Sequence, residues 1–167
     1  MAVKPQSREG IMAPDESTRR EHIRDLLTRA YWMEMETVMS YMAASINPDG
    51  LRAREIVESL EKDIDEELGH ARRFATRIKE LYGVVPGSRA FTAEQSYLQP
   101  PEHQTDLAHV VRGVIEAETG AIEHYTSIIE ETDEVDPVTQ DMVIDILRDE
   151  QGHRRLFEGY LRELEQD

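Results

Sequence analysis

The sequence predicts an all-α protein, an antiparallel four-helix bundle with one long crossover between the second and third helices. Four long stretches carry apolar residues at alternating spacings of three and four, as helices do when they bury one face. Two short turns, at residues 47–50 and 133–136, join these stretches in pairs. One long segment without a helical pattern, residues 84–103, connects the two pairs. The length of 167 residues is that of a single domain.

The first pair of helices has clear local boundaries. Residues 1–14 show no periodicity and contain two prolines, so we expect a flexible N-terminal arm and assign residues 15–167 to the bundle domain. Acidic residues 15–16 favour a helix start, because they lie near the positive end of the helix dipole. This first helix runs to about Ile46, where the Asn-Pro-Asp-Gly turn ends it. The second runs from about Leu51 to Tyr82, before Gly83.

The second pair follows after the crossover. Thr105 is the expected cap of a third helix that ends near Thr132, and Asp136-Pro137 is a typical start for the fourth. The second helix, about 32 residues, would be about 48 Å long. Twenty extended residues reach about 66 Å, so the crossover can return along the whole bundle. We therefore expect the second and third helices to run parallel.

Composition excludes several classes of protein. Lys and Arg number 19 against 35 Asp and Glu, a net charge of −16, which disfavours nucleic-acid binding and favours metal cations as partners. No stretch approaches the ~20 apolar residues of a membrane helix, so no membrane contact is expected. The absence of cysteine excludes disulfides, thiolate sites and iron–sulfur clusters. The N-terminal segment lacks the apolar core of a signal peptide, which predicts a cytoplasmic protein.

Each predicted core stripe is interrupted near its middle by Glu, or by Glu with His three residues later. The interrupting residues are Glu34, Glu67, His70, Glu118, Glu150 and His153. A buried carboxylate without a partner costs several kcal/mol. The stripes contain no Lys or Arg that would pair with these glutamates. Two divalent cations would balance four glutamates with two neutral histidines. The sequence therefore predicts a dinuclear site, and mixed carboxylate and imidazole ligands suit iron or manganese.

The two halves of the chain repeat this pattern. Residues 67–74 and 150–157 share the sequence E-x-G-H-x-R-x-F. Glu34 precedes Tyr41 by seven residues, as Glu118 precedes Tyr125. Corresponding residues lie 83 or 84 positions apart throughout, which indicates a duplicated helical hairpin.

The pattern Glu, Glu-x-x-His, Glu, Glu-x-x-His on four helices resembles the ferritin-like di-iron carboxylate proteins. Residues 140–153, QDMVIDILRDEQGH, are most similar to bacterioferritin. The resemblance implies two iron ions per chain, with manganese as an alternative. It implies the six residues above as ligands, with Glu67 and Glu150 bridging and Glu34 and Glu118 terminal. Tyr41 and Tyr125 would hydrogen-bond to ligands.

Three departures from related families set further expectations. Leu68 stands where bacterioferritin has its haem-ligating Met, so no haem is expected. The sequence ends with the fourth helix and lacks the short fifth helix of cage-forming relatives, so a closed cage of that kind is not expected. The cysteine-rich iron domain of rubrerythrins is also missing.

Other polar and apolar residues have simpler interpretations. Asp63 lies on the core stripe one turn before Glu67; it could pass metal inward, but a hydrogen-bonded helix residue is the preferred interpretation. The remaining polar candidates are expected at the surface: Glu36, Glu116, Glu123, His22, His103, His109 and His124. A second apolar line on the first helix either packs under the crossover or forms the face of a homodimer, which we favour: Trp32, Met35, Met39 and Met42.

Three functions fit this site. The first is ferroxidase activity, in which Fe(II) is oxidised to Fe(III) by O₂ or H₂O₂, for iron storage or detoxification. The alternative is a dinuclear manganese or iron oxidoreductase, either a peroxide-removing catalase or peroxidase or a small-molecule oxidase. The third is a bundle that the metal only stabilises.

Overall fold

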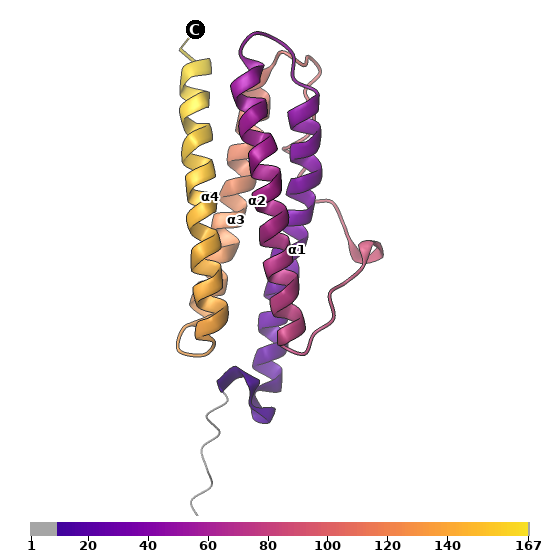
Figure 1. Cartoon of the computed structure of the whole chain (residues 1–167), viewed down its shortest axis with the longest axis vertical. Coiled ribbons are helices and arrows are strands. Elements are labelled where there is room, and N and C mark those ends of the chain that lie inside the picture. The colour runs from indigo at the N-terminus through magenta and orange to yellow at the C-terminus, as the bar shows by residue number, and fades with distance from the viewer. Residues whose placement is uncertain (1–9, 167) are drawn as a thin grey trace, which may run out of the picture.

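The computed structural model describes residues 10–166 and confirms the antiparallel four-helix bundle (Figure 1). The helices are α1 (Ser17–Ile46), α2 (Ala53–Glu80), α3 (Leu107–Thr132) and α4 (Pro137–Leu164). α1 and α2 form one antiparallel pair and α3 and α4 the other (Figure 1). Because the crossover returns along the bundle, α2 and α3 run parallel, as expected (Figure 1). None of the described helices is long and apolar enough to cross a membrane.

Aspartate residues cap the N-termini of α3 and α4. The Asp136 carboxylate accepts a hydrogen bond from the Thr139 backbone N–H at 3.1 Å, and Pro137 follows at the first helical position, as predicted. The cap of α3 is Asp106, which accepts from the His109 backbone N–H at 3.0 Å, and not Thr105. α2 begins two residues later than expected, because the turn that contains Gly50, with a φ of +111°, extends through Arg52.

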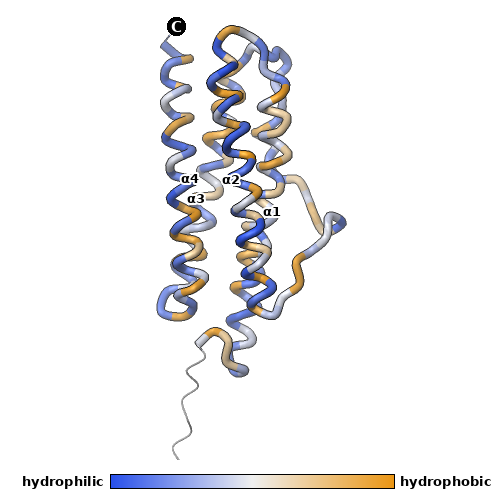
Figure 2. Tube along the Cα trace, viewed as in Figure 1, coloured by the Kyte–Doolittle hydropathy of each residue, from blue (hydrophilic) through white to orange (hydrophobic). Residues whose placement is uncertain are grey.

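The apolar core is divided into two clusters, one on each side of the middle of the bundle. One contains Leu27, Phe74 and Ile146, and the other Leu60, Val111 and Phe157. Hydrophobic and hydrophilic residues alternate along every helix (Figure 2), consistent with one buried face per helix. The glutamates and histidines that interrupt the core stripes thus lie between two apolar clusters.

Arg77 is a charged residue on the buried side of α2. It is buried and donates hydrogen bonds to Thr139 Oγ1 at 2.8 Å and to Asp136 Oδ1 at 2.9 Å. Asp136 is itself fully buried. This charged pair therefore fastens the end of α2 to the start of α4, where an apolar residue would leave Asp136 without a counter-charge.

Part of the segment expected to be a flexible arm packs on the bundle. Residues 1–9 lie outside the described residues, but residues 10–14 pack on the base of the bundle. Ile11 is buried in the core, and Arg20 donates to the carbonyl oxygens of Ile11 at 2.9 Å and Ala13 at 2.8 Å. A lone apolar residue outside a periodic stretch gives no pattern, so the sequence did not reveal this contact.

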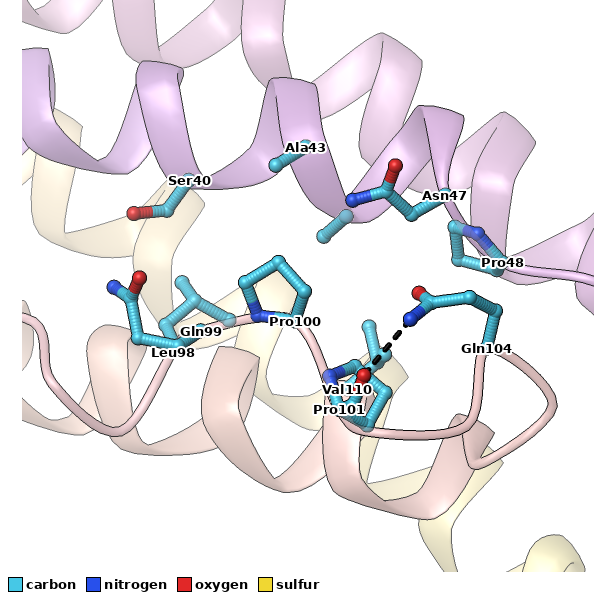
Figure 3. A pocket seen from close by; sticks show the side chains of 11 residues that line it. Ser40, Ala43, Asn47, Pro48, Leu98, Gln99, Pro100, Pro101, Gln104 and Val110 are labelled. Carbon is cyan, nitrogen blue, oxygen red and sulfur yellow. Dashed lines mark hydrogen bonds between the residues drawn. The ribbon is translucent and has the colours of Figure 1, made fainter.

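The crossover follows α2 and contains one short 3₁₀ turn, Ser88–Ala90. Its first part lies away from the helices, and its later part returns to α1 (Figure 1). Figure 3 shows a pocket between the C-terminal part of α1, with Ser40 and Ala43, and the returning crossover, where Gln104 donates to the carbonyl oxygen of Pro101 at 2.8 Å.

Gly113 of α3 allows the crossover to approach the helix closely. A Cβ at this position would lie 2.8 Å from the carbonyl oxygen of Tyr97 and 2.9 Å from Leu98 Cδ1. We expect Gly113→Ala to lower the free energy of unfolding by about 1–3 kcal/mol in urea titrations, because backbone must shift. Gly159→Ala, a helical glycine whose nearest neighbour is 3.8 Å away, is the control and should not destabilise. Equal effects of both changes would contradict this account of the contact.

Candidate metal centre

The six candidate ligands converge at the middle of the bundle, and all are buried. They form two overlapping groups, in each of which the ligand atoms lie within 4.8 Å of one another. The first group is Glu34, Glu67, His70 and Glu150, and the second is Glu67, Glu118, Glu150 and His153. Glu67 and Glu150 belong to both groups, so their carboxylates lie between two places that could each hold an ion.

Both histidines direct Nδ1 toward the glutamates. His70 Nδ1 lies 3.0 Å from Glu67 Oε2, 2.9 Å from Glu150 Oε1 and 3.7 Å from Glu34 Oε1. His153 Nδ1 lies 3.2 Å from Glu67 Oε1 and 3.8 Å from both Glu118 Oε1 and Glu150 Oε2. The two halves of the site therefore have the same construction, which follows from the sequence repeat.

The outer nitrogen of each histidine contacts an acidic residue on the opposite helix. His70 Nε2 lies 3.0 Å from Asp149 Oδ2, and His153 Nε2 lies 2.7 Å from Glu66 Oε2. A carboxylate that accepts the Nε2 hydrogen leaves Nδ1 as the free ligand atom and fixes the orientation of the ring. The sequence did not lead us to predict a role for these two acids, although each directly precedes the glutamate of a Glu-x-x-His motif, Glu66 in the first half and Asp149 in the second.

The two tyrosines link opposite halves of the site. The Tyr41 hydroxyl donates a hydrogen bond to Glu118, and the Tyr125 hydroxyl donates to Glu34. Burial, followed by the nearby glutamate charges, raises the pKa of both tyrosines well above the usual value, so both remain donors. Each tyrosine thus holds one candidate terminal glutamate, in agreement with the expectation from the sequence.

In the absence of metal ions, protons on the glutamates and histidines balance the negative charge of the site. Burial, followed by repulsion from Glu67 and Glu150, raises the pKa of Glu34, and the same causes raise that of Glu118. Burial alone would lower the pKa of His70, but contacts with Glu150 and Glu67 raise it to about 10. Contacts with the same two glutamates raise the pKa of His153 to about 12.

Several buried polar atoms of the site have no hydrogen-bond partner. They are Glu67 Oε1, Glu118 Oε2, Glu150 Oε1 and His153 Nδ1. His70 Nδ1 lies within 3.0 Å of both Glu67 Oε2 and Glu150 Oε1, but one ring nitrogen can form a hydrogen bond with only one of these carboxylates. Unpartnered buried oxygen and nitrogen atoms are unfavourable in a protein interior, and bound cations would satisfy them. The residues present therefore fit two divalent ions of the iron or manganese type.

Asp63 breaks the symmetry of the repeat, because the corresponding residue in the second half is Ile146. Asp63 Oδ1 lies 3.5 Å from His153 Nε2, and its buried Oδ2 has no hydrogen-bond partner. Burial, partly offset by His153, raises the pKa of Asp63 to about 6. Asp63 therefore contacts His153 through one oxygen only, and with Glu66 and His153 it forms a third group whose ligand atoms lie within 4.8 Å of one another.

Two residues expected at the surface are buried. Glu36 accepts hydrogen bonds from the backbone N–H groups of Glu94 and Gln95, both at 2.8 Å. His124 Nε2 donates to the carbonyl oxygen of Leu26 at 2.9 Å, and burial lowers its pKa. Both residues lie beside the core stripes: the crossover covers Glu36 on a second face of α1, and His124 of α3 is covered by α1. The other residues expected at the surface are exposed, as predicted: Glu116, Glu123, His22, His103 and His109.

The second apolar line of α1 has two environments. Trp32 contacts the ring of Phe91 in the crossover, with ring centroids 5.4 Å apart. Met39 and Met42 are about half exposed, at 53% and 50%. One end of the line therefore packs under the crossover, and the other end is exposed.

The comparisons with known proteins agree with this geometry. The ferritin-like domain model matches residues 24–167. A DNA protection during starvation protein from Pyrococcus furiosus is 32% identical over 84% of this chain and 77% of its own length, and a bacterioferritin from Desulfovibrio desulfuricans is 25% identical over 89% and 79%.

Solved structures with lower sequence identity show the same fold. A dodecameric thioferritin from Bacteroides fragilis has a TM-score of 0.77 at 21% identity, covering 92% of this chain and 96% of its own. The bacterioferritin structure from Desulfovibrio desulfuricans has a TM-score of 0.78 at 22% identity, covering 92% and 86%. The chain belongs to the ferritin-like domain family, as the sequence motifs indicated.

Proposed function

We propose that this chain is a ferroxidase, which binds two Fe(II) ions as substrate and transfers their electrons to O₂ or H₂O₂. The observation that carries the proposal is the pair of overlapping ligand groups, which share two buried glutamates and contain unpartnered buried oxygen atoms. The similarity to bacterioferritin supports iron as the metal. Carboxylates favour Fe(III) over Fe(II), because negative charge stabilises the higher oxidation state.

The protein groups have distinct roles in this reaction. Glu34 and Glu118 would each hold one ion, while Glu67 and Glu150 would contact both, since only these two belong to both groups. Tyr41 and Tyr125 would keep the terminal glutamates in place. With H₂O₂, the two ions supply the two electrons and two protons are taken up, so that the O–O bond breaks and two water molecules form. The helix-borne ligands hold both ions near one oxidant, which favours transfer of both electrons.

Addition of Fe(II) to metal-free protein in air tests the proposal. The account predicts that ferric absorbance develops faster than in buffer, and that the first phase ends at about two irons per chain. Soluble oxidation far beyond this ratio would add iron storage to the function. If wild-type protein and Glu118→Ala oxidise iron no faster than buffer, the ferroxidase proposal is wrong. Manganese as the metal bound on isolation would favour the oxidoreductase alternative.

One relative is named for DNA protection and not for iron. A net charge of −16 opposes binding to the phosphate backbone of DNA. We therefore propose metal binding, and not DNA binding, for this chain. Its cytoplasmic location and the absence of haem stay predictions.

We also propose that the exposed methionines of α1 form part of a homo-oligomer interface. Met39 and Met42 are apolar, about half exposed and adjacent on one face. Met39→Asp is expected to lower the solution mass measured by light scattering, because a buried unpaired charge opposes association. Asp at the exposed Val138 of α4 is the matched control. An unchanged mass for Met39→Asp would exclude this face as the interface.

A further inference from the structure

The metal centre has a small cavity on the side of α1 and α3. Its volume is about 10 Å³, close to the least that holds one water molecule, and its walls include four glutamates of the site together with Ala117 and Ala121 of α3. The remaining wall residues are the two tyrosines of the site, Tyr41 and Tyr125, and three residues of α1 and the crossover, Met33, Thr37 and Gln95. The cavity therefore extends from the candidate ligands toward the crossover.

A larger surface pocket of about 440 Å³ adjoins this cavity. It lies between α1, α3 and the crossover, and it shares Met33 and Gln95 with the wall of the metal cavity. These two side chains thus form the partition between the surface pocket and the metal centre. On the opposite side of the site, His70 contacts Asp149 and His153 contacts Glu66, and these contacts join α2 and α4.

Gln95 is the fixed part of this partition. Its Nε2 donates to Thr37 Oγ1 at 2.7 Å, and its Oε1 accepts from Ser40 Oγ at 3.0 Å. Its backbone N–H donates to Glu36, and the side chain is only 6% exposed. Because the Glu36 carboxylate also holds the N–H of Glu94, the backbone of the crossover is attached independently of the Gln95 side chain.

Met33 is the movable part. Its side chain is unbranched and has several rotatable bonds, so it can change rotamer at small cost. Gly120 of α3 lies opposite, and even an added Cβ there would be 4.0 Å from the Met33 methyl group. Movement of Met33 would therefore open a narrow passage, whose other side Gln95 keeps in place.

We propose that molecules reach the metal centre from the α1–α3 side past Met33, and that Gln95 limits their size, admitting O₂ or H₂O₂ and excluding organic hydroperoxides. This inference rests on the proposed function and deepens it, since it assigns the class of oxidant. An organic hydroperoxide could otherwise serve the same chemistry: two Fe(II) and two protons convert it to an alcohol, water and two Fe(III). Size, and not reactivity, would then decide between the oxidants.

The first experiment compares cumene hydroperoxide with H₂O₂ as oxidants of Fe(II)-loaded protein. Gln95→Ala is expected to raise the initial rate with cumene hydroperoxide, relative to that with H₂O₂, by about tenfold, as a change in pocket size does. Gln95→Met, which restores the bulk without the hydrogen bonds, should return the ratio toward the wild-type value. Gln104→Ala is the matched control, because this crossover glutamine contacts Pro101 in a separate pocket (Figure 3).

The second experiment needs no turnover. Under anaerobic conditions, capture of bound Fe(II) by the bulky chelator ferrozine should be independent of ferrozine concentration in the wild type, because iron must leave before it is captured. In Gln95→Ala the rate should rise with ferrozine concentration, since the chelator can enter. Met33→Ala opens the same partition and replaces Gln95→Ala if that variant does not fold by circular dichroism.

The outcomes separate this inference from the proposed function. If the wild type oxidises Fe(II) with H₂O₂ but Gln95→Ala changes neither the oxidant ratio nor the ferrozine dependence, the passage lies elsewhere and the inference is wrong. If the wild type oxidises no Fe(II), the ferroxidase proposal fails, and the ferrozine measurement still decides whether Gln95 controls access to bound iron.

Discussion

Glu67→Ala is expected to lower the initial rate of Fe(II) oxidation by at least about 100-fold, because even groups outside the ligand shell change metal affinity 10–100-fold. Glu67 belongs to both ligand groups, lies 3.0 Å from His70 Nδ1 and lies 3.2 Å from His153 Nδ1. Its removal therefore affects both ions, whereas loss of Glu34 or Glu118 removes a ligand from one group only. The rate is measured by ferric absorbance in stopped flow.

Glu61→Ala is the matched control for this change, because it removes an exposed glutamate from the same helix. Its rate should equal that of the wild type, since an exposed carboxylate contributes only to the general negative field. Circular dichroism of both variants checks that the bundle is intact. If Glu67→Ala and Glu61→Ala oxidise iron equally fast, oxidation occurs at the acidic surface and not in the bundle.

Metal binding should also raise the stability of the fold by a large amount. At a free Mn(II) concentration of about 1,000 times Kd, linkage predicts a gain of about 4 kcal/mol. For a chain of this size that gain corresponds to a rise in Tm of about 8–16 °C. The reason is that the ions would satisfy the unpartnered buried oxygen and nitrogen atoms and replace protons on the glutamates and histidines.

Scanning calorimetry with and without Mn(II) measures this effect, and Mn(II) is used because air does not oxidise it under neutral conditions. Glu67→Ala should show little or no rise in Tm, while Glu61→Ala should behave as the wild type. A similar rise in all three proteins would show that manganese binds to the exposed acidic residues. No rise in the wild type would contradict a metal-binding function for the buried site.

The helices and the glutamate–histidine cluster were predictable from the sequence because they are periodic. A stripe of apolar residues fixes which side of each helix is buried, and Glu34 or His153 on that stripe must then be buried too. The repeat added the expectation that the two halves meet. The reciprocal hydrogen bonds of Tyr41 and Tyr125 follow from the same symmetry.

Several contacts that were not predicted depend on segments without periodicity. Glu36 was expected in solvent, but the crossover supplies two backbone N–H donors to it. Gln95 is an ordinary polar residue in an irregular segment, and only the fold brings it to the metal cavity. Ile11 is buried for the same kind of reason, since residues 10–14 turn back onto α1. Contacts of this kind depend on the path of the chain, which local sequence does not determine.

Anaerobic titration of Fe(II) into metal-free protein, followed by calorimetry, is the most direct test of the dinuclear site. The two ligand groups predict that about two ions bind per chain in the wild type, and that Glu34→Ala, which lacks one terminal glutamate, binds about one. Glu61→Ala should again bind two. A single ion per wild-type chain, or two ions bound by Glu34→Ala with unchanged affinity, would contradict the account.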